Sequence, residues 1–328
     1  GWPWWIFVLI VVAAATLFGF IKYEFSQFKK GFSTLLVPPL FKVRTFSAGI
    51  AVMLVFAMAF IGFFFTYTLT LQIGLDFSAL KTALIGIPVA IGIMISAAAL
   101  VRKLLPKLGG RVMTVGAVIL GIGLILIALA LERYGLHTTW YELLPGLFIF
   151  GMGMGMLFAA VFAVLYNDVD PQFAGAASGL QNAVQQVAGA IGVAIVGVIL
   201  FAAIKSNAVN SINSVIPQLK TQLSSLSVPP PAQAAVIHNL KRCYVTQASS
   251  SDPSKTPKGC EQPAATSPVQ KRIGQAAATA ATKANQKNFS HSFSITVYYD
   301  LALLFIAFLV SLLLPRHLKH PEAAGEAA

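Results

Sequence analysis

Long, uninterrupted apolar stretches dominate the hydrophobicity pattern of the chain. A bilayer core of about 30 Å requires about 20 mostly apolar residues per helix, because lipid offers no hydrogen-bond partner to a free backbone amide. Seven stretches meet this requirement: 4–21, 46–71, 83–101, 112–131, 143–165, 180–204 and 297–314. Their apolar positions are continuous rather than alternating, which argues against transmembrane strands. The pattern therefore predicts an all-α integral membrane protein with seven transmembrane helices.

The spans divide the chain into segments of different character. These segments are a hydrophobic head (1–21), a basic loop (22–45), five closely spaced spans (46–204), a long polar interval (205–295), a last span (296–315) and a tail (316–328). No basic segment precedes the first span, which is therefore not a signal peptide. A chain that opens with Gly1 and a hydrophobic helix is expected to be part of a longer protein.

Composition excludes the two main alternatives to a membrane protein. Apolar residues make up 57% of the 328 residues and charged residues only 10%, against about 25% in soluble domains. So few charges cannot cover a soluble protein of this size. The high apolar content, with 24 phenylalanines, excludes a disordered chain.

The net charge of +12 is explained by where the basic residues lie. Positive charge in short loops marks the cytoplasmic side of a membrane protein. One set of loops and the tail carry eleven basic residues: Lys22, Lys29, Lys30, Lys42, Arg44, Arg102, Lys103, Lys107, Arg111, Arg316 and Lys319. The opposite short loops carry two, Lys81 and Arg133. We therefore expect a plasma or inner membrane protein with its N-terminus outside, its C-terminus in the cytoplasm and no nucleic-acid partner.

Aromatic residues give an independent indication of the outer boundary, because Trp and Tyr gather at membrane–water interfaces. The predicted outer belt comprises Trp2, Trp4, Trp5, Tyr134, Trp140, Tyr141, Tyr298 and Tyr299.

The polar interval 205–295 carries ten basic residues and two acidic ones, Asp252 and Glu261, and is expected to be an extracytoplasmic loop. It begins with a helical stripe of apolar residues: Val209, Ile212, Ile216, Leu219, Leu223 and Leu226. Pro217 is expected to kink or divide that helix, and its apolar face to rest on the outer leaflet or on the spans. Residues 229–268, rich in Pro, Ser, Thr and Ala, are expected to be coil.

Both cysteines, Cys243 and Cys260, lie in this interval. An extracytoplasmic location permits a disulfide, which we favour over two free thiols and which would contribute about 3 kcal/mol. Asn288-Phe-Ser290 matches a glycosylation sequon, a pattern too common to carry weight.

The sixth span carries a polar arc. Seven small or polar residues fall within about 140° of one helix face at 100° per residue: Ser178, Gln181, Asn182, Gln185, Gln186, Gly189 and Gly192. Amides that face lipid are costly, so the arc faces either protein or a wet cavity. Interhelical hydrogen bonding is slightly favoured over the lining of a substrate path, and both interpretations stay open.

Small residues four positions apart let membrane helices approach closely. The expected helix-packing glycines are Gly151, Gly155, Gly175, Gly179, Gly189 and Gly192. Pro88 interrupts the third span and Pro145 opens the fifth; kinked helices in transporters often flank a binding region, although packing is the commoner reason.

Ionisable groups inside the spans are nearly absent. Asp300, about one turn inside the last span, is the sole carboxylate candidate, and its nearness to the predicted boundary favours a solvated, interfacial side chain. No catalytic triad and no set of metal ligands is present in the sequence, so we expect neither an enzyme nor a cofactor or metal.

Several residue strings resemble one known family. They are Leu143 to Met156, Asn167 to Asn182 and Ala183 to Ile195, with Glu24, Pro38-Pro39-Leu40-Phe41, Arg44, Phe46, Leu71-Gln72, Ser78-Ala79-Leu80 and Pro88 before them. Together they resemble the C-terminal half of the EmrB/QacA-type, fourteen-span drug:proton antiporters of the major facilitator superfamily. The resemblance covers nearly the whole chain except the long polar interval.

The resemblance implies a linker helix (1–21) followed by a six-helix C-terminal bundle of two inverted triplets. The stretch 101–111 resembles a degenerate gating loop, with Arg102, Lys107, Gly109 and Arg111 as its candidate residues and without the acid of the full motif.

By resemblance, the chain is the C-terminal portion of a secondary active transporter that exports lipophilic drug-like compounds by proton antiport and alternating access. Its expected partners are the lipid bilayer, a small lipophilic substrate, protons and the missing N-terminal half, which would hold most of the acids for proton coupling. The candidates for the substrate path are Phe64, Tyr67, Gln72, Gln181, Asn182 and Gln185.

Two other classes share features of this chain. Seven spans with an outer N-terminus also describe a receptor, but the last span, 297–314, lacks the deep lysine of a retinal-type receptor. A long outer loop argues against a ligand-gated type. A channel-like subunit would need a ring of charges or a filter sequence, and neither is found.

Overall fold

The structure, a computed structural model, describes residues 3–32, 34, 36–134, 140–250, 257, 259–260 and 267–312. These residues form helices and connecting turns without any strand, and they include seven helical stretches long and apolar enough to cross a membrane. The predicted all-α membrane fold is therefore confirmed. The predicted belt residue Trp2, the side chain of Tyr134 and the basic tail from residue 316 lie outside the described part.

The spans follow the predicted order. They are α1 (Trp4–Lys29); α2 (Arg44–Leu69) with the π-helical turn η2 (Thr70–Gly74); the broken third span of α3 (Ala79–Ile85), α4 (Ile87–Ile95), the π-helical turn η3 (Ser96–Val101) and α5 (Arg102–Leu108); α6 (Arg111–Tyr134); α7 (Trp140–Tyr166); α8 (Ala174–Ser225); and α10 (Pro268–Ser311). The short 3₁₀ turns η1 (Pro38–Lys42) and η5 (Pro171–Phe173) precede α2 and α8. The third span breaks at Gly86, and Pro88 then occupies the first turn of α4, where no helical N–H is needed.

Several contacts between the helices after α1 follow a symmetric pattern, although the extensive contact of α8 with α10 has no comparable counterpart between α4 and α6. The contact between α2 and α8 corresponds to the contact between α7 and α4. In the same way, the contact between α6 and α7 corresponds to the contact between α10 and α2. The first helices of the two triplets, α2 and α7, also touch each other, as do the last, α6 and α10. Exchanging the triplet α2–α6 with the triplet α7–α10 leaves these pairs unchanged, which is the arrangement of an internal repeat.

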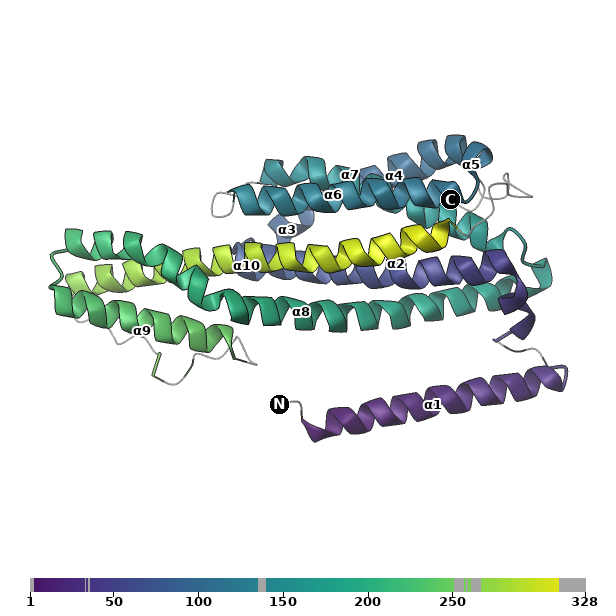
Figure 1. The fold of residues 1–328 in the computed structure, drawn as a ribbon, viewed down its shortest axis with the longest axis horizontal. Coiled ribbons are helices and arrows are strands. Elements are labelled where there is room, and N and C mark those ends of the chain that lie inside the picture. Colours follow the sequence, from purple (N-terminus) through teal and green to yellow (C-terminus); the bar gives the residue numbers. More distant parts are fainter. Residues whose placement is uncertain are drawn as a thin grey trace.

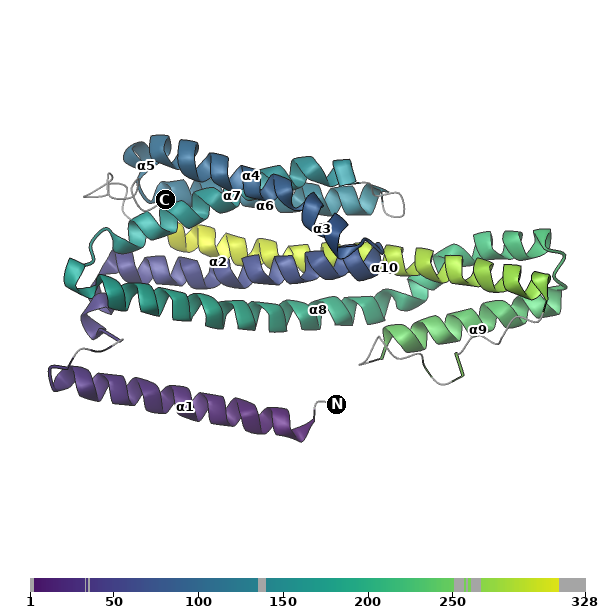
Figure 2. The same ribbon diagram turned by 180° about the vertical axis from the view of Figure 1, so that it is seen from behind.

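The long helices run along one direction, with α4, α6 and α7 on one side of the bundle and α2, α8 and α10 on the other (Figure 1). α1 lies apart from both layers, and the view from behind shows the same separation (Figure 2). Its apolar side chains are exposed along its length, and Glu24, near its C-terminal end, is its buried residue. Such a helix must face lipid or another protein segment.

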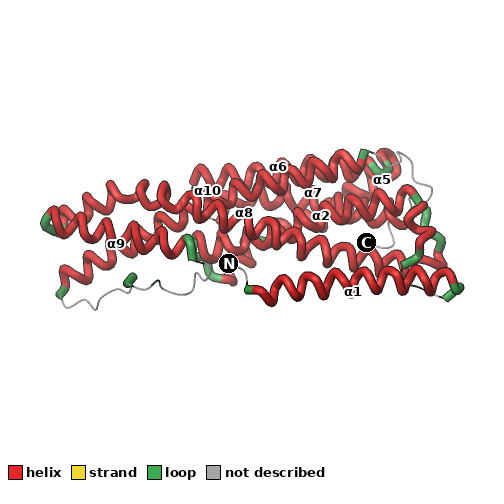
Figure 3. Tube along the Cα trace, turned by 60° about the horizontal axis from the view of Figure 1, so that its bottom comes forward, coloured by secondary structure: helices red, strands yellow, loops and turns green. Residues whose placement is uncertain are grey.

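α8 and α10 continue well beyond the bundle at one end, where α9 (Pro230–Ala248) packs against both (Figure 3). We call the described residues 205–250 and 267–288 the extension, and the opposite end of the bundle, near Lys29, Arg44 and Arg111, the basic end. The extension has its own apolar core of Ile212, Val215, Leu219, Leu223, Val228, Ala280 and Ala284.

The structure corrects the expected coil of this region and decides between the two alternatives for Pro217 as far as a break is concerned. Residues 229–268 are not coil throughout, because Pro230–Ala248 forms α9, which begins with prolines at its first turn and buries apolar positions against α8. α8 is not divided at Pro217, because its apolar stripe packs into the core of the extension on both sides of that residue. The stripe therefore rests on neighbouring helices rather than on a lipid leaflet.

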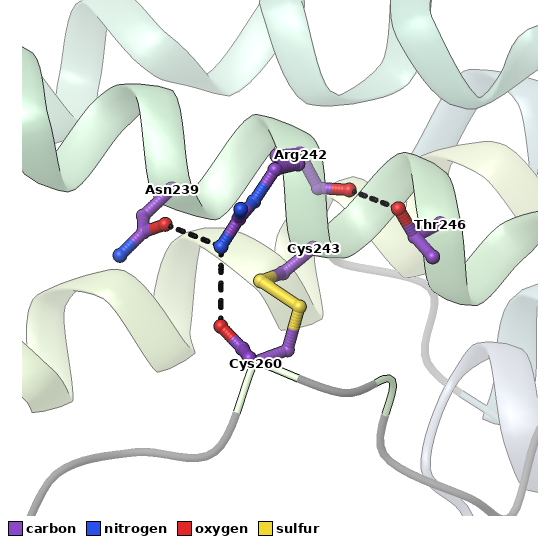
Figure 4. The surroundings of a disulfide bond; sticks show 6 residues. Asn239, Arg242, Cys243, Thr246 and Cys260 are labelled. Carbon is purple, nitrogen blue, oxygen red and sulfur yellow. Dashed lines mark hydrogen bonds between the residues drawn. A yellow bond between two sulfur atoms is a disulfide. The ribbon is translucent and has the colours of Figure 1, made fainter.

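The disulfide Cys243–Cys260 joins α9 to the segment that follows it (Figure 4). Arg242 lies beside it and donates hydrogen bonds from Nη2 to Oδ1 of Asn239 (3.0 Å) and to the carbonyl oxygen of Gly259 (3.2 Å). Gly259 has a φ of +77°, a conformation that side chains with a Cβ rarely adopt. The bridge holds this turn against the side of α9.

Candidate functional site: the bundle interior and the exposed face of α8

An aromatic cluster fills the middle of the bundle. α2 contributes one helix stripe, Phe56, Phe60, Phe63, Phe64 and Tyr67, and α7 and α10 add Phe150, Phe158 and Phe293. The closest pair, Phe63 and Phe150, has ring centroids 4.4 Å apart, and Phe56 meets Phe158 edge to face at 5.0 Å. Such pairs add to the burial of their surface. The spacing of these aromatic residues along α2 is visible in the sequence, although the substrate-path candidates include only Phe64 and Tyr67 of the stripe.

The last span enters the bundle earlier than hydropathy indicated. Asn285 Nδ2 donates to the carbonyl oxygen of Ile73 at 2.9 Å, and Phe289 abuts Gly74, so this part of α10 is level with the end of η2. At the other end the hydroxyls of Ser311 and Thr114 are 2.8 Å apart. The part of α10 within the bundle therefore runs from about Phe289 to Ser311, eight residues longer at its start than predicted.

The reason is that the polar residues at the start of this span face protein. Asn288, Ser290, Ser292, Ser294 and Thr296 are all buried. Their hydroxyls bond mainly within the helix; Ser294 Oγ, for example, donates to the carbonyl oxygen of Ser290. A hydropathy scan cannot distinguish polar residues inside a bundle from polar residues in water.

This shift moves Asp300 from the boundary to the middle of the bundle. Asp300 lies eleven residues from both Phe289 and Ser311, about 16 Å along the helix from each. Its exposed fraction is 0%, so the expectation of a solvated, interfacial carboxylate was wrong. The predicted belt residues Tyr298 and Tyr299 lie at nearly the same depth, so they do not belong to an outer belt either.

Asp300 borders a small cavity of about 10 Å³, enough for one water molecule at most. The other residues that line it are apolar: Phe56, Ala59, Phe60, Phe63, Leu120, Leu124, Phe150 and Leu304. Neither carboxylate oxygen has a hydrogen-bond partner among the described residues, and the same is true of the Tyr67 hydroxyl.

The polar arc of α8 divides into two faces. On the buried face, Gln181 Oε1 accepts a hydrogen bond from the Tyr166 hydroxyl at 2.7 Å, while Gly189 and Gly192 lie against Ile61 and Met58 of α2. This face therefore makes the interhelical hydrogen bond and close contacts that the structural interpretation of the arc predicts.

On the other face, Asn182 and Gln186 are exposed and Ser178 is partly exposed. Asn182 Nδ2 donates to the carbonyl oxygen of Ser178 within the same helix, and Gln185, beside this face, is partly buried. Gly175 and Gly179 have no side chain of another described residue near them. A polar, unfilled face on a helix that crosses a membrane requires water or another protein segment beside it.

The six substrate-path candidates do not gather at one place. Gly62 of α2 packs on Val196 of α8, so Phe64 lies near the level of Val196, about 22 Å along α8 from Gln181. Phe64, Tyr67 and Gln72 belong to the half of the bundle nearer the extension, and Gln181, Asn182 and Gln185 belong to the half nearer the basic end. Of these, Tyr67 and Gln181 are buried and Asn182 is exposed.

The glycines of α7 are sites of close helix approach. Gly151 faces the backbone of Val89 and Gly155 faces Ile93 and the Ser96 hydroxyl, so this pair lets α4 lie directly against α7. The pair Gly175 and Gly179 differs, because it makes no such contact within the described part of the chain.

The stretch with the gating-loop resemblance is helical up to Leu108. Arg102, Lys107 and Arg111 are exposed at the basic end of the bundle, whereas Gly109 is buried and has a φ of +53°. Its N–H bonds to the carbonyl oxygen of Leu105 at 2.8 Å, and its own carbonyl oxygen accepts from Val112 at 3.2 Å. A residue with a Cβ would be strained there, which explains a glycine between α5 and α6.

Comparisons with known proteins agree with this architecture. The family model of the Major Facilitator Superfamily matches residues 1–193. The chain is 33% identical over 323 residues to a probable actinorhodin transporter of Streptomyces coelicolor. This alignment covers 98% of this chain and 55% of the relative. It is 30% identical over 138 residues to a puromycin resistance protein of Streptomyces alboniger, covering 42% of this chain and 27% of that protein. A tetracenomycin C resistance and export protein of Streptomyces glaucescens is 25% identical over 203 residues, covering 61% of this chain and 36% of that protein. The chain thus spans about half the length of the first of these relatives, or less of the others.

Proposed function

Since the chain belongs to the Major Facilitator Superfamily of membrane transporters, we propose that it is the C-terminal part of an exporter of lipophilic, drug-like compounds that works by proton antiport. Transport would proceed by alternating access, in which this bundle rocks against an N-terminal bundle around a central cavity. Membership of this family leaves the receptor and channel alternatives without support.

The exposed polar face of α8 is the observation that carries this proposal. Asn182 and Gln186 are exposed, and Ser178 is partly exposed, on a helix that is otherwise built to cross a membrane; Gly175 and Gly179 beside them leave room for close approach. An N-terminal bundle packed on the glycines would enclose a cavity that these polar side chains line. The partly exposed rings of Phe60 and Phe158 would supply apolar surface for a lipophilic substrate.

The names of the relatives support the substrate class. They refer to transport of actinorhodin, resistance to puromycin, and resistance to and export of tetracenomycin C. We propose that this protein exports a compound of similar, antibiotic-like character from the cytoplasm, with the basic end of the bundle on the cytoplasmic side and the extension outside.

Efflux of a fluorescent lipophilic dye from cells that express the complete transporter tests this function. Efflux should occur and should stop when a protonophore collapses the proton gradient. Asn182→Leu and Gln186→Leu should slow efflux at least tenfold, whereas Asn213→Leu, the same change on the exposed surface of α8 within the extension, should not. Efflux that continues in the presence of the protonophore would refute antiport. Efflux by the Asn182→Leu and Gln186→Leu variants at the rate of Asn213→Leu would refute the role of this face.

A further inference from the structure

We propose that Asp300 is a proton-binding site of the transporter, protonated in the conformation seen here and deprotonated when water reaches it. This proposal rests on the proposed proton antiport and names a residue of the C-terminal bundle that takes part in it. Four observations on the described residues carry it.

The first is depth. The cavity beside Asp300 is lined by residues from the central parts of α2, α6 and α7, such as Ala59, Leu120 and Phe150, and Asp300 is itself midway along the bundle part of α10. A charge at this depth is strongly disfavoured relative to water unless it is paired.

The second is the absence of a counter-charge nearby. The described titratable and charged side chains of the helices packed around it are Arg44 and Tyr67 of α2; Arg111, Glu132 and Arg133 of α6; Tyr141, Glu142 and Tyr166 of α7; Lys205 and Lys220 of α8; and Lys271, Arg272, Lys283, Lys287, His291, Tyr298 and Tyr299 of α10 itself. The lysines and arginines in this set lie at helix ends or in the extension, so none is level with Asp300. The titratable groups next to it along α10 are the uncharged hydroxyls of Tyr298 and Tyr299.

The third is hydrogen bonding. Both oxygens of Asp300 are buried without a partner among the described residues. An ionised carboxylate at this place would lose its hydration without gaining a hydrogen bond or a counter-charge from the described residues. The desolvation cost of a neutral carboxyl group is much smaller. The carboxyl group therefore holds a proton in this closed arrangement.

The fourth is a short route to the outside of the bundle. Phe60 lines the cavity together with Asp300 and is itself only partly buried. The Phe60 side chain therefore borders the cavity and also reaches the surface of the bundle. Phe60 also contacts Phe64 and Phe158, whose rings are partly exposed. Rotation of the Phe60 ring, coupled to rocking of the bundle, admits water to the cavity. The carboxyl O–H bond then breaks, the proton passes to water as hydronium, and a carboxylate remains to be reprotonated from the other side.

Two measurements on the complete transporter, reconstituted in liposomes, test this site. The first compares uptake driven by an imposed proton gradient with substrate exchange at equal pH, for wild type, Asp300→Asn and Asp76→Asn. Asp300→Asn should lose at least tenfold of gradient-driven uptake and keep exchange, because a neutral amide has no proton to release. Asp76 is exposed, with a φ of +57° that Asn also tolerates, so Asp76→Asn should behave like wild type.

The outcomes separate the two proposals. If wild type and Asp300→Asn take up substrate at the same rate under the proton gradient, the role of Asp300 is overturned, whereas proton antiport remains supported. Wild-type transport that is indifferent to the gradient would overturn proton antiport and the role of Asp300 with it.

The second measurement does not depend on transport. Dicyclohexylcarbodiimide reacts with protonated carboxyl groups in apolar surroundings, and mass spectrometry of the peptide that contains Asp300 reports the adduct. Labelling that falls at least fivefold between pH 6 and pH 9, under conditions in which the transporter cycles, supports the site. The absence of an adduct, or equal labelling at both pH values, overturns the proposed proton-binding site. Because this experiment uses the wild-type protein, it decides the question even if Asp300→Asn does not fold.

Discussion

Asn288 Nδ2 donates a hydrogen bond to the carbonyl oxygen of Ile204 over 2.9 Å, at the level where α8 and α10 leave the bundle and enter the extension. The same amide reaches the hydroxyl of Tyr244 at 3.3 Å, so one fully buried side chain connects α8, α9 and α10. The sequon around Asn288 is therefore not available as a glycan acceptor in this fold. Its amide instead joins the extension to the membrane bundle.

Removing this amide should loosen the extension. Asn288→Ala leaves the Tyr244 hydroxyl without its partner, which should cost about 1–3 kcal/mol. If trypsin cleaves only the transiently opened extension, the rate of cleavage should rise about 5- to 150-fold. Asn285→Ala, three residues away, removes only a solvent-exposed hydrogen bond and should change the rate by less than about threefold. Equal effects of the two substitutions would show that Asn288 has no special role.

The glycines of α7 and α8 should respond differently to an added methyl group. A Cβ at Gly151 would overlap the backbone of Val89, so Gly151→Ala should force α4 and α7 apart at a cost of about 1–3 kcal/mol. A Cβ at Gly179 meets no described atom within 4 Å beyond the adjoining backbone of its own helix, and alanine favours a helix over glycine by about 1 kcal/mol. Thermal unfolding of this chain in detergent, followed by tryptophan fluorescence, should show a lower midpoint for Gly151→Ala and an unchanged or higher one for Gly179→Ala. A drop for Gly179→Ala would mean that the exposed face of α8 is packed within this chain.

Tyr244 should titrate at unusually high pH. Burial raises the pKa of its hydroxyl to about 12, partly offset by the hydrogen bond from Asn288. The folded extension holds this proton more tightly than the unfolded chain does, so the stability that Tyr244 contributes is complete below about pH 10 and is lost as the pH rises through 12. The difference between ultraviolet titrations of wild type and Tyr244→Phe should place the midpoint near 12. A midpoint near 10 would show that the ring is solvated.

The two cysteines provide a test of orientation. After reduction, a membrane-impermeant maleimide should label Cys243 and Cys260 from outside intact cells, because we place the extension on the extracytoplasmic side. Without reduction, labelling should be absent, since the disulfide occupies both thiols. Labelling that requires access from the cytosol would reverse the proposed topology, and labelling without reduction would argue against the bridge in the cell.

The sequence predicted the helical spans well because the requirement behind them is local. A stretch such as 143–165 must bond its own backbone within the membrane, so its apolar length alone predicts α7. The sequence was less informative where a polar residue had two permissible surroundings. Ser292 and Asn288 are as polar as loop residues, and only the neighbouring helices show that they are buried. The same holds for Pro217, which the core of the extension keeps within a continuous α8.

The sequence by itself determined the class of protein, the number of spans and the family resemblance, because these depend on composition and on patterns within single helices. Tertiary structure alone decided which side of α8 is packed and which is open, where the glycine pairs are used, and that Asp300 lies in the middle of the bundle. These properties depend on which helices adjoin one another. Hydropathy averages over the faces of a helix, and the same aspartate is solvated at a membrane boundary or enclosed by aromatic rings according to neighbours that are distant in sequence.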